Sequence, residues 1–204
     1  MSDLYQSNRK LVATYRQQLQ QKIVSLHQAE QSSDNIDPQK FYLGFKDRAI
    51  ELVQKETDLL QKECADSDNC HLLLLKQTAL VDTLVQASFY SAVWYFNHQN
   101  NQEWTTQSVP IAIVARGGYG REEMYFRSDV DIQIVSESSI SESDKKTAEQ
   151  IIRHFEYLFV FQDIFPASIN ACYTENETFE KDQDTAKVAD FMALLEHRFV
   201  MFLQ

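Results

Sequence analysis

The glycines of this 204-residue chain are concentrated at one place. Of its four glycines, Gly117, Gly118 and Gly120 fall within four positions, and Gly44 stands alone. Glycine adopts positive φ angles that other residues avoid, and it lets another group approach the backbone closely. A chain that avoids glycine elsewhere needs unusual backbone geometry at residues 117–120, and there we expect a functional site.

The glycines lie between two predicted strands. Residues 111–115 form a short continuous apolar run, which is typical of a buried strand, and they lead directly into the glycines. Residues 129–134 then alternate between polar and apolar side chains, which predicts a second strand. Because alternate side chains of a strand point to opposite faces, Asp129 and Asp131 share one face while the valine and isoleucines are buried on the other.

The rest of the pattern predicts an α+β protein. Apolar residues recur mostly at four-residue intervals before residue 100 and predict three long helices, over about 4–26, 38–59 and 72–99. After the strands we expect a polar loop at 136–144, a helix over 148–159, a strand over 167–174 and a final helix over 184–202. The predicted organisation is an N-terminal helical module, residues 1–105, packed on a core with a small mixed sheet, residues 106–204. Because residues 199–203 are apolar, we expect either that the final helix docks on the core or that the chain is the front part of a longer protein, and we favour the second.

Charge and cysteine usage exclude several classes of protein. The 30 acidic residues outnumber the 19 Lys and Arg, and the net charge of -11 repels nucleic-acid phosphates, so we expect no general nucleic-acid binding. Three cysteines are too few for a disulfide framework. The first residues contain no apolar stretch of signal-peptide length, so we expect no signal peptide, and polar residues such as Asp82 interrupt the longest apolar runs. These features predict a cytoplasmic protein without a membrane span.

The residues around the glycines point to phosphate and metal chemistry. Successive glycines at the end of a strand let backbone N–H groups approach a phosphate chain. Asp129 and Asp131 on one face repel each other unless a cation lies between them, which indicates a Mg²⁺ site. The segment is not a P-loop, because no Gly-Lys-Ser/Thr follows, and residue 123 is a glutamate rather than the last glycine of Gly-x-Gly-x-x-Gly. Phosphoryl or nucleotidyl transfer is the chemistry that this combination favours.

The motif resembles that of a known family. Gly-Gly-Tyr-Gly-Arg-Glu-Glu at 117–123, followed by Ser-Asp-Val-Asp-Ile at 128–132, is similar to the signature of the bacterial PII-uridylyltransferase-like nucleotidyltransferases. These belong to the DNA polymerase β-type nucleotidyltransferase superfamily, and glutamine synthetase adenylyltransferases and putative signal-transduction nucleotidyltransferases carry related versions. The close resemblance covers about residues 111–135, and a weaker one extends over 157–200. It implies that residues 106–204 are a minimal nucleotidyltransferase core.

The resemblance also implies roles for individual residues. In the family, backbone amides hold the nucleotide triphosphate, and carboxylates bind the one or two Mg²⁺ ions needed for catalysis. Carried over to this sequence, the amides are those of Gly117 and Gly118, the catalytic and metal-binding carboxylates are Asp129 and Asp131, the phosphate-contacting side chain is Arg121, and Ser128 orients the loop of Asp129.

The reaction implied by the resemblance is transfer of a nucleoside monophosphate from ATP or UTP to an acceptor. By analogy with the family, the acceptor is a regulatory protein in signal transduction, modified on a tyrosine hydroxyl. These 204 residues contain no counterpart of the HD hydrolase and ACT domains of PII uridylyltransferases, so we expect no nitrogen-sensing role from this chain.

One departure from the family leaves two functions open. The superfamily places a third carboxylate on a later strand, whereas the candidate strand at 167–174 contains no acid. Asp163 and Glu175 flank that strand and are candidates to replace it. The two alternatives are an active nucleotidyltransferase, which we favour, and a catalytically degenerate module that binds nucleotide or a protein partner.

Overall fold

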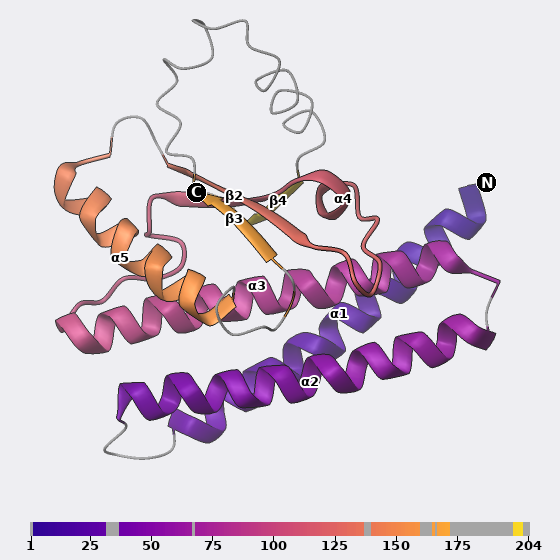
Figure 1. Ribbon diagram of the computed structural model, residues 1–204, viewed down its shortest axis with the longest axis horizontal. Helices are drawn as coiled ribbons and strands as arrows, with labels where there is room; N and C mark the ends of the chain where they lie inside the picture. Colours follow the sequence, from indigo (N-terminus) through magenta and orange to yellow (C-terminus); the bar gives the residue numbers. More distant parts are fainter. Residues whose placement is uncertain are drawn as a thin grey trace, which may run out of the picture.

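The computed structural model describes residues 2–31, 37–66, 68–136, 140–159, 165, 167–171 and 198–201. Within these residues the chain forms long helices first and a sheet afterwards, as shown in Figure 1. The helices are α1 (Ser2–Gln31), α2 (Pro38–Asp66), α3 (Cys70–Asn100), α4 (Gly117–Gly120) and α5 (Glu142–Phe159). The strands are β1 (Ile111–Ala115), β2 (Val130–Ser136), β3 (Ala167–Ala171) and β4 (Arg198–Met201).

Local capping explains where the long helices begin and end. At the start of α2, the Asp37 carboxylate accepts a hydrogen bond from the Gln39 amide, 3.0 Å away. At the start of α3, the Asn69 side chain accepts one from the Leu72 amide at 3.2 Å. α3 ends where Asn101 adopts a left-handed conformation, a usual helix terminator. The three predicted helices are therefore present.

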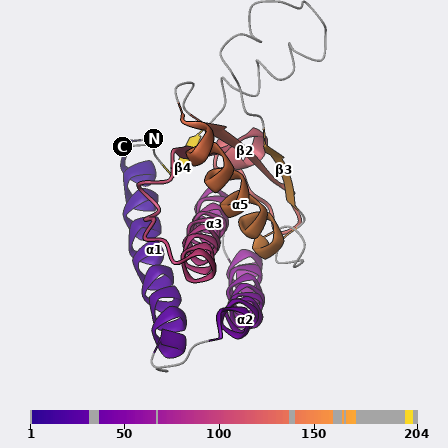
Figure 2. The same cartoon turned by 90° about the vertical axis from the view of Figure 1, so that its left-hand side faces the viewer.

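α3 is the central helix of the molecule. It packs against α1 and α2 on one side and against α5 and the sheet on the other. Figure 2, in which α2 and α3 are seen nearly end-on while α1 runs lengthwise beside them, shows α3 between α2 and the sheet. α3 is accordingly apolar around most of its circumference, as expected for a helix buried on several sides.

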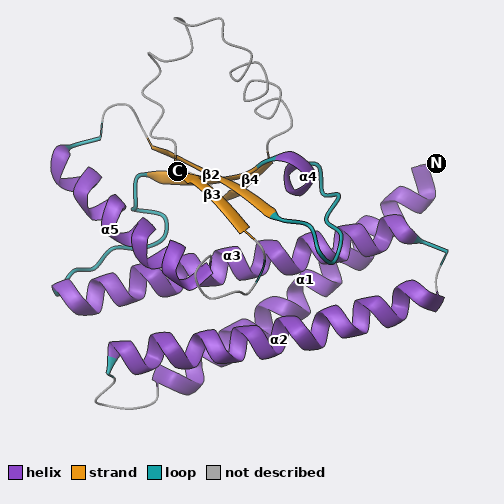
Figure 3. Ribbon diagram, in the orientation of Figure 1, coloured by secondary structure: helices purple, strands orange, loops and turns teal. Residues whose placement is uncertain are grey.

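The sheet is small and mixed, with the strand order β3-β2-β1-β4. β1 pairs antiparallel with both β2 and β4, whereas β2 and β3 are parallel. Figure 3 shows the sheet above the helical layer. The predicted α+β fold, with N-terminal helices packed on a small mixed sheet, is confirmed.

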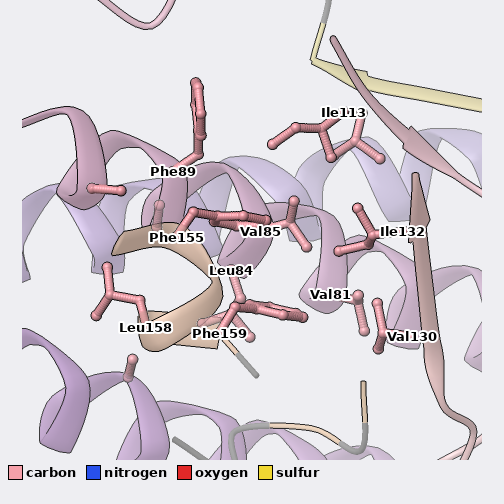
Figure 4. Close-up of a cluster of buried hydrophobic side chains, with 14 of the residues drawn as sticks. Val81, Leu84, Val85, Phe89, Ile113, Val130, Ile132, Phe155, Leu158 and Phe159 are labelled. Atoms are coloured by element: carbon pink, nitrogen blue, oxygen red, sulfur yellow. The ribbon is translucent and has the colours of Figure 1, made fainter. Parts of the chain in front are cut away.

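The main hydrophobic core lies between the sheet and helices α3 and α5. Figure 4 shows side chains from β1 and β2 facing those of the two helices. The Phe89 ring of α3 meets the Phe155 ring of α5 edge-on, with ring centroids 6.0 Å apart. Because the same continuous cluster also includes residues of α1 and α2, the helices and the sheet are stabilised together.

Two predicted element boundaries are wrong. The predicted loop at 136–144 is shorter than expected, because Ser141 accepts a hydrogen bond from the Asp144 amide and α5 already begins at Glu142. The predicted final helix over 184–202 is wrong at residues 198–201, which form β4; residues 184–197 and 202 lie outside the described residues. A short apolar run fits a helix or a strand, and here the edge of β1 pairs with it.

Among the residues that the structure describes, no helix combines the length and hydrophobicity needed to cross a bilayer.

We expect Phe155→Ala to lower the free energy of unfolding by about 3–5 kcal/mol, because it empties a fully buried position between α3, α5 and the sheet. Urea unfolding measures the loss. The control is Gln150→Ala, an exposed site on the same helix, for which we expect a change within about 0.5 kcal/mol. Equal losses in the two variants would contradict this description of the core.

Candidate active site

The glycine turn, residues 116–123, begins directly after β1 and contains the short helix α4. Gly117 has a φ of 54°, in the left-handed region that other residues rarely adopt. A Cβ added to Gly117 would lie 2.9 Å from Oδ2 of Asp131, closer than real Cβ atoms approach an oxygen. The positive φ favours glycine at position 117, and the close approach places the turn beside the Asp131 carboxylate.

Hydrogen bonds within the backbone close the turn. The amides of residues 120–123 donate to carbonyl oxygens of residues 116–119 over 2.8–3.2 Å. Two buried side chains anchor the turn to the core, those of Tyr119 and Met124, each 1% exposed. The amides that the sequence assigns to the triphosphate, those of Gly117 and Gly118, precede these four; their role as phosphate ligands stays a prediction.

Asp129 immediately precedes β2, and Asp131 is the second residue of the strand. Val130 and Ile132 are buried in the core, while Asp129 is exposed and Asp131 is half-buried. The alternation expected from the sequence is present at residues 129–132, whereas Gln133, expected on the polar face, is buried at 4% exposure. The Asp131 carbonyl accepts a hydrogen bond from the Arg116 amide at 2.9 Å, so the β1–β2 pairing extends up to the glycine turn. The turn and the aspartates thus meet at the end of β1 and the start of β2, the two central strands of the sheet.

The two other predicted site residues lie in the loop between α4 and β2. Nε of Arg121 donates to the Glu123 carboxylate at 2.8 Å, and both side chains are exposed. An exposed ion pair of this kind is weak, so its arginine can exchange the carboxylate for a phosphate. Ser128 Oγ accepts a hydrogen bond from the Tyr125 amide at 3.1 Å and closes the tight turn before Asp129. This contact suits the predicted role of Ser128 in orienting the Asp129 loop.

β3, which belongs to the candidate strand for the third carboxylate of the superfamily, lies beside β2. In the parallel register, Ser168 pairs with Asp131, and Asn170 pairs with Gln133. Among the described residues, no group of three His, Cys, Asp or Glu side chains gathers at a metal-binding distance. Asp163 and Glu175, the candidates to complete the site, lie outside the described residues.

The sequence did not indicate the polar contacts that attach the glycine turn to the long helices. The Tyr119 hydroxyl donates to Asp82 of α3 at 2.9 Å, and Asp82 also accepts from Arg16 of α1 at 2.8 Å. Glu122 binds Arg9 of α1, and this hydrogen bond raises the pKa of the arginine above its ordinary value. An aspartate inside the apolar pattern of α3 was the available signal, because a buried carboxylate requires a partner.

Comparison with curated proteins gives one consistent result. The chain is similar to bifunctional uridylyltransferase/uridylyl-removing enzymes over about half its length. Identity is 34% over 111 residues with the enzyme of Zymomonas mobilis and 28% over 111 residues with those of Neisseria meningitidis serogroups A and B. The matched stretch covers 52–54% of this chain and 11% of each relative. No protein-family model matches the chain.

The similarity agrees at a coarse level with the nucleotidyltransferase resemblance expected from the motif. It concerns a small part of each relative, since the matched stretch spans about a tenth of their length. The activity, substrates and partners of this chain are therefore matters for proposal.

We expect Gly117→Ala to lower the free energy of unfolding by at least about 1 kcal/mol, because alanine is strained at positive φ and its methyl group meets Asp131. The matched control is Gly118→Ala, whose added Cβ has its nearest neighbour 3.8 Å away and should change stability by less than about 0.5 kcal/mol. Urea midpoints of the two variants check the difference. If Gly117→Ala is as stable as Gly118→Ala, the close approach to Asp131 is wrong.

Proposed function

We propose that this chain carries the nucleotide site of a Mg²⁺-dependent nucleotidyltransferase that transfers a nucleoside monophosphate from UTP or ATP to an acceptor hydroxyl. The observation that carries the proposal is the contact between Gly117 and the Asp131 carboxylate. It brings together, at one end of the central strands β1 and β2, a turn suited to phosphate and a strand suited to a divalent cation. The similarity to uridylyltransferases over 111 residues supports the same chemistry.

In the proposed reaction, the acceptor oxygen forms a bond to the α-phosphorus of the nucleotide. The bond between the α-phosphorus and the bridging oxygen breaks, pyrophosphate leaves, and the hydroxyl proton passes to solvent. Negative charge accumulates on the phosphates as this happens, and fixed hydrogen-bond donors and cations stabilise it. In this proposal, the amides of Gly117 and Gly118 and the exposed Arg121 guanidinium stabilise this charge.

Asp129 and Asp131 fit a magnesium ion by their chemistry. Mg²⁺ prefers oxygen ligands and is commonly held by one or two carboxylates together with substrate phosphates. When bound, it neutralises phosphate charge and lowers the pKa of the attacking hydroxyl. The half-buried Asp131 is held beside the turn, and Asp129 follows the Ser128 turn that fixes its backbone. In this proposal, the two aspartates are the carboxylate ligands of the ion.

The donor base and the acceptor rest on the similarity alone. The names of the relatives favour UTP over ATP as the donor. By the same analogy the acceptor is a regulatory protein, modified on a tyrosine hydroxyl.

One observation favours a second candidate function. β3 contains no acidic residue, and the position paired with Asp131 is Ser168. A site that binds nucleotide with two carboxylates but lacks the third would act as a nucleotide-binding or partner-binding module without transfer.

We expect Asp129→Asn/Asp131→Asn to reduce nucleotidyl transfer by about 100-fold or more, because it removes both carboxylate ligands of the proposed metal. The purified chain is incubated with Mg²⁺, host lysate and UTP or ATP labelled at the α-phosphate, and labelled protein is measured.

The matched control is Asp58→Asn/Asp66→Asn, which makes the same charge change at two exposed positions of α2 and should leave transfer intact. If transfer is absent, calorimetry with Mg²⁺ and the same nucleotides separates the alternatives. Binding that the first double variant abolishes supports the module without transfer. An absence of both transfer and nucleotide binding contradicts the transferase and the nucleotide-binding module, and leaves only a module that binds a protein partner.

We expect Ser168→Asp to strengthen Mg²⁺-dependent nucleotide binding by about tenfold, because it introduces a carboxylate at the position paired with Asp131. Calorimetry in the presence and absence of Mg²⁺ measures the change. Asn170→Asp is the control, since its register partner is Gln133 rather than an aspartate. A larger gain for Asn170→Asp would contradict this prediction, because it would assign the missing carboxylate to position 170 and not to position 168.

A further inference from the structure

A set of ion pairs connects the glycine turn to the first and third helices. We call Arg9, Arg16, Asp82, Tyr119 and Glu122 the arginine network. Arg16 of α1 lies 2.8 Å from one carboxylate oxygen of Asp82 and 3.6 Å from one of Glu122. The second oxygen of Asp82 accepts from the Tyr119 hydroxyl, and the second oxygen of Glu122 accepts from Arg9. The network thus joins α1 and α3 to two residues of the turn.

The burial of these groups makes Arg16 the central member. The side chains of Asp82 and Glu122 are 8% and 13% exposed, whereas those of Arg16 and Arg9 are 36% and 38% exposed. A carboxylate removed from water needs a cation and hydrogen-bond donors to remain charged. Since Arg16 is shared between both carboxylates, its removal weakens the contacts of Asp82 and Glu122 together.

The backbone of Glu122 is itself unusual. Its φ is 63°, in the left-handed region that is uncommon for a residue with a side chain. Residues persist in such conformations only where the surroundings hold them, and they gather at functional sites. Gly117 at the start of the turn also has a positive φ. The turn therefore contains two residues with left-handed backbone conformation, Gly117 near its start and Glu122 near its end, and the arginines contact the second.

We infer that Arg16, together with Arg9, is a positioning residue for the nucleotide site. Through Glu122, Asp82 and Tyr119, it holds the glycine turn in the conformation that places Gly117 against Asp131. Helix α1 then contributes to the nucleotide site indirectly, because its arginines contact the glycine turn and not the nucleotide. The consequence for nucleotide affinity rests on the proposed function, whereas the rigidity of the turn can be measured without it.

The test compares Arg16→Gln with Lys22→Gln. Lys22 is a matched control, because it lies on the same helix and pairs with the buried carboxylate of Glu56, on α2 and away from the turn. Hydrogen exchange of residues 117–125 is measured by mass spectrometry, together with urea unfolding and calorimetric titration of UTP and ATP with Mg²⁺. A purely stabilising network predicts that the two variants behave alike.

We expect both variants to lose stability, and only Arg16→Gln to increase exchange in residues 117–125 beyond the rest of the chain. Nucleotide affinity should fall about tenfold or more in Arg16→Gln and remain near that of the original chain in Lys22→Gln. If Arg16→Gln does not fold, Arg9→Gln removes only the outer contact to Glu122 and serves in its place, with the same contrast expected.

Equal exchange in residues 117–125 for the arginine variant and Lys22→Gln would overturn the inference. A result in which the original chain binds neither nucleotide contradicts the proposed function, and the exchange contrast still decides whether the arginines position the turn. The variant Glu122→Gln tests the same contact from the turn, because it keeps the length of the side chain and removes the charge that both arginines contact. It should raise exchange in the turn as Arg16→Gln does, and unchanged exchange would also overturn the inference.

Discussion

The buried carboxylate of Asp82 is the interaction on which the candidate site depends. It lies in the middle of an otherwise apolar helix, where an unpaired charge would be strongly destabilising. Arg16 of α1 and Tyr119 of the glycine turn each donate a hydrogen bond to a different oxygen of this carboxylate. One side chain of α3 therefore specifies how α1 approaches the core and where the turn is held, and packing around α3 fixes the remaining elements.

In the glycine turn, Glu122 combines an unfavourable backbone conformation with favourable ion pairs. Left-handed backbone at a residue other than glycine costs on the order of 1–2 kcal/mol, and here it occurs at Glu122, next to the candidate site. The side chain of the same residue binds two arginines, so the unfavourable backbone and the favourable ion pairs are located on one residue. Such an arrangement holds a loop in one conformation before a ligand arrives, which lowers the entropy lost on binding.

Much of the fold and the position of the site could be predicted from the sequence, because local patterns determine them. The apolar run at 111–115 located β1, the alternation that begins at Asp129 located β2, and the cluster of glycines located the turn. Longer-range information was missing where local patterns fit two structures. The apolar residues 198–201 suit a helix end or a strand, and pairing with β1 decides between them. Likewise, an aspartate within the apolar pattern of α3 needs a polar partner, but the sequence does not show that this partner is Arg16, which lies 66 residues away.

The position of β4 has a consequence for how the chain is made. β4 pairs with β1, and the Val200 carbonyl accepts a hydrogen bond from Gln86 of α3 at 3.1 Å. During synthesis, β1 leaves the ribosome long before residues 198–201 do, so one edge of a fully apolar strand stays unpaired while the intervening chain is translated. Open strand edges promote association between chains. A nascent or truncated chain that ends before β4 is therefore expected to aggregate or to engage chaperones, although its helices can already form.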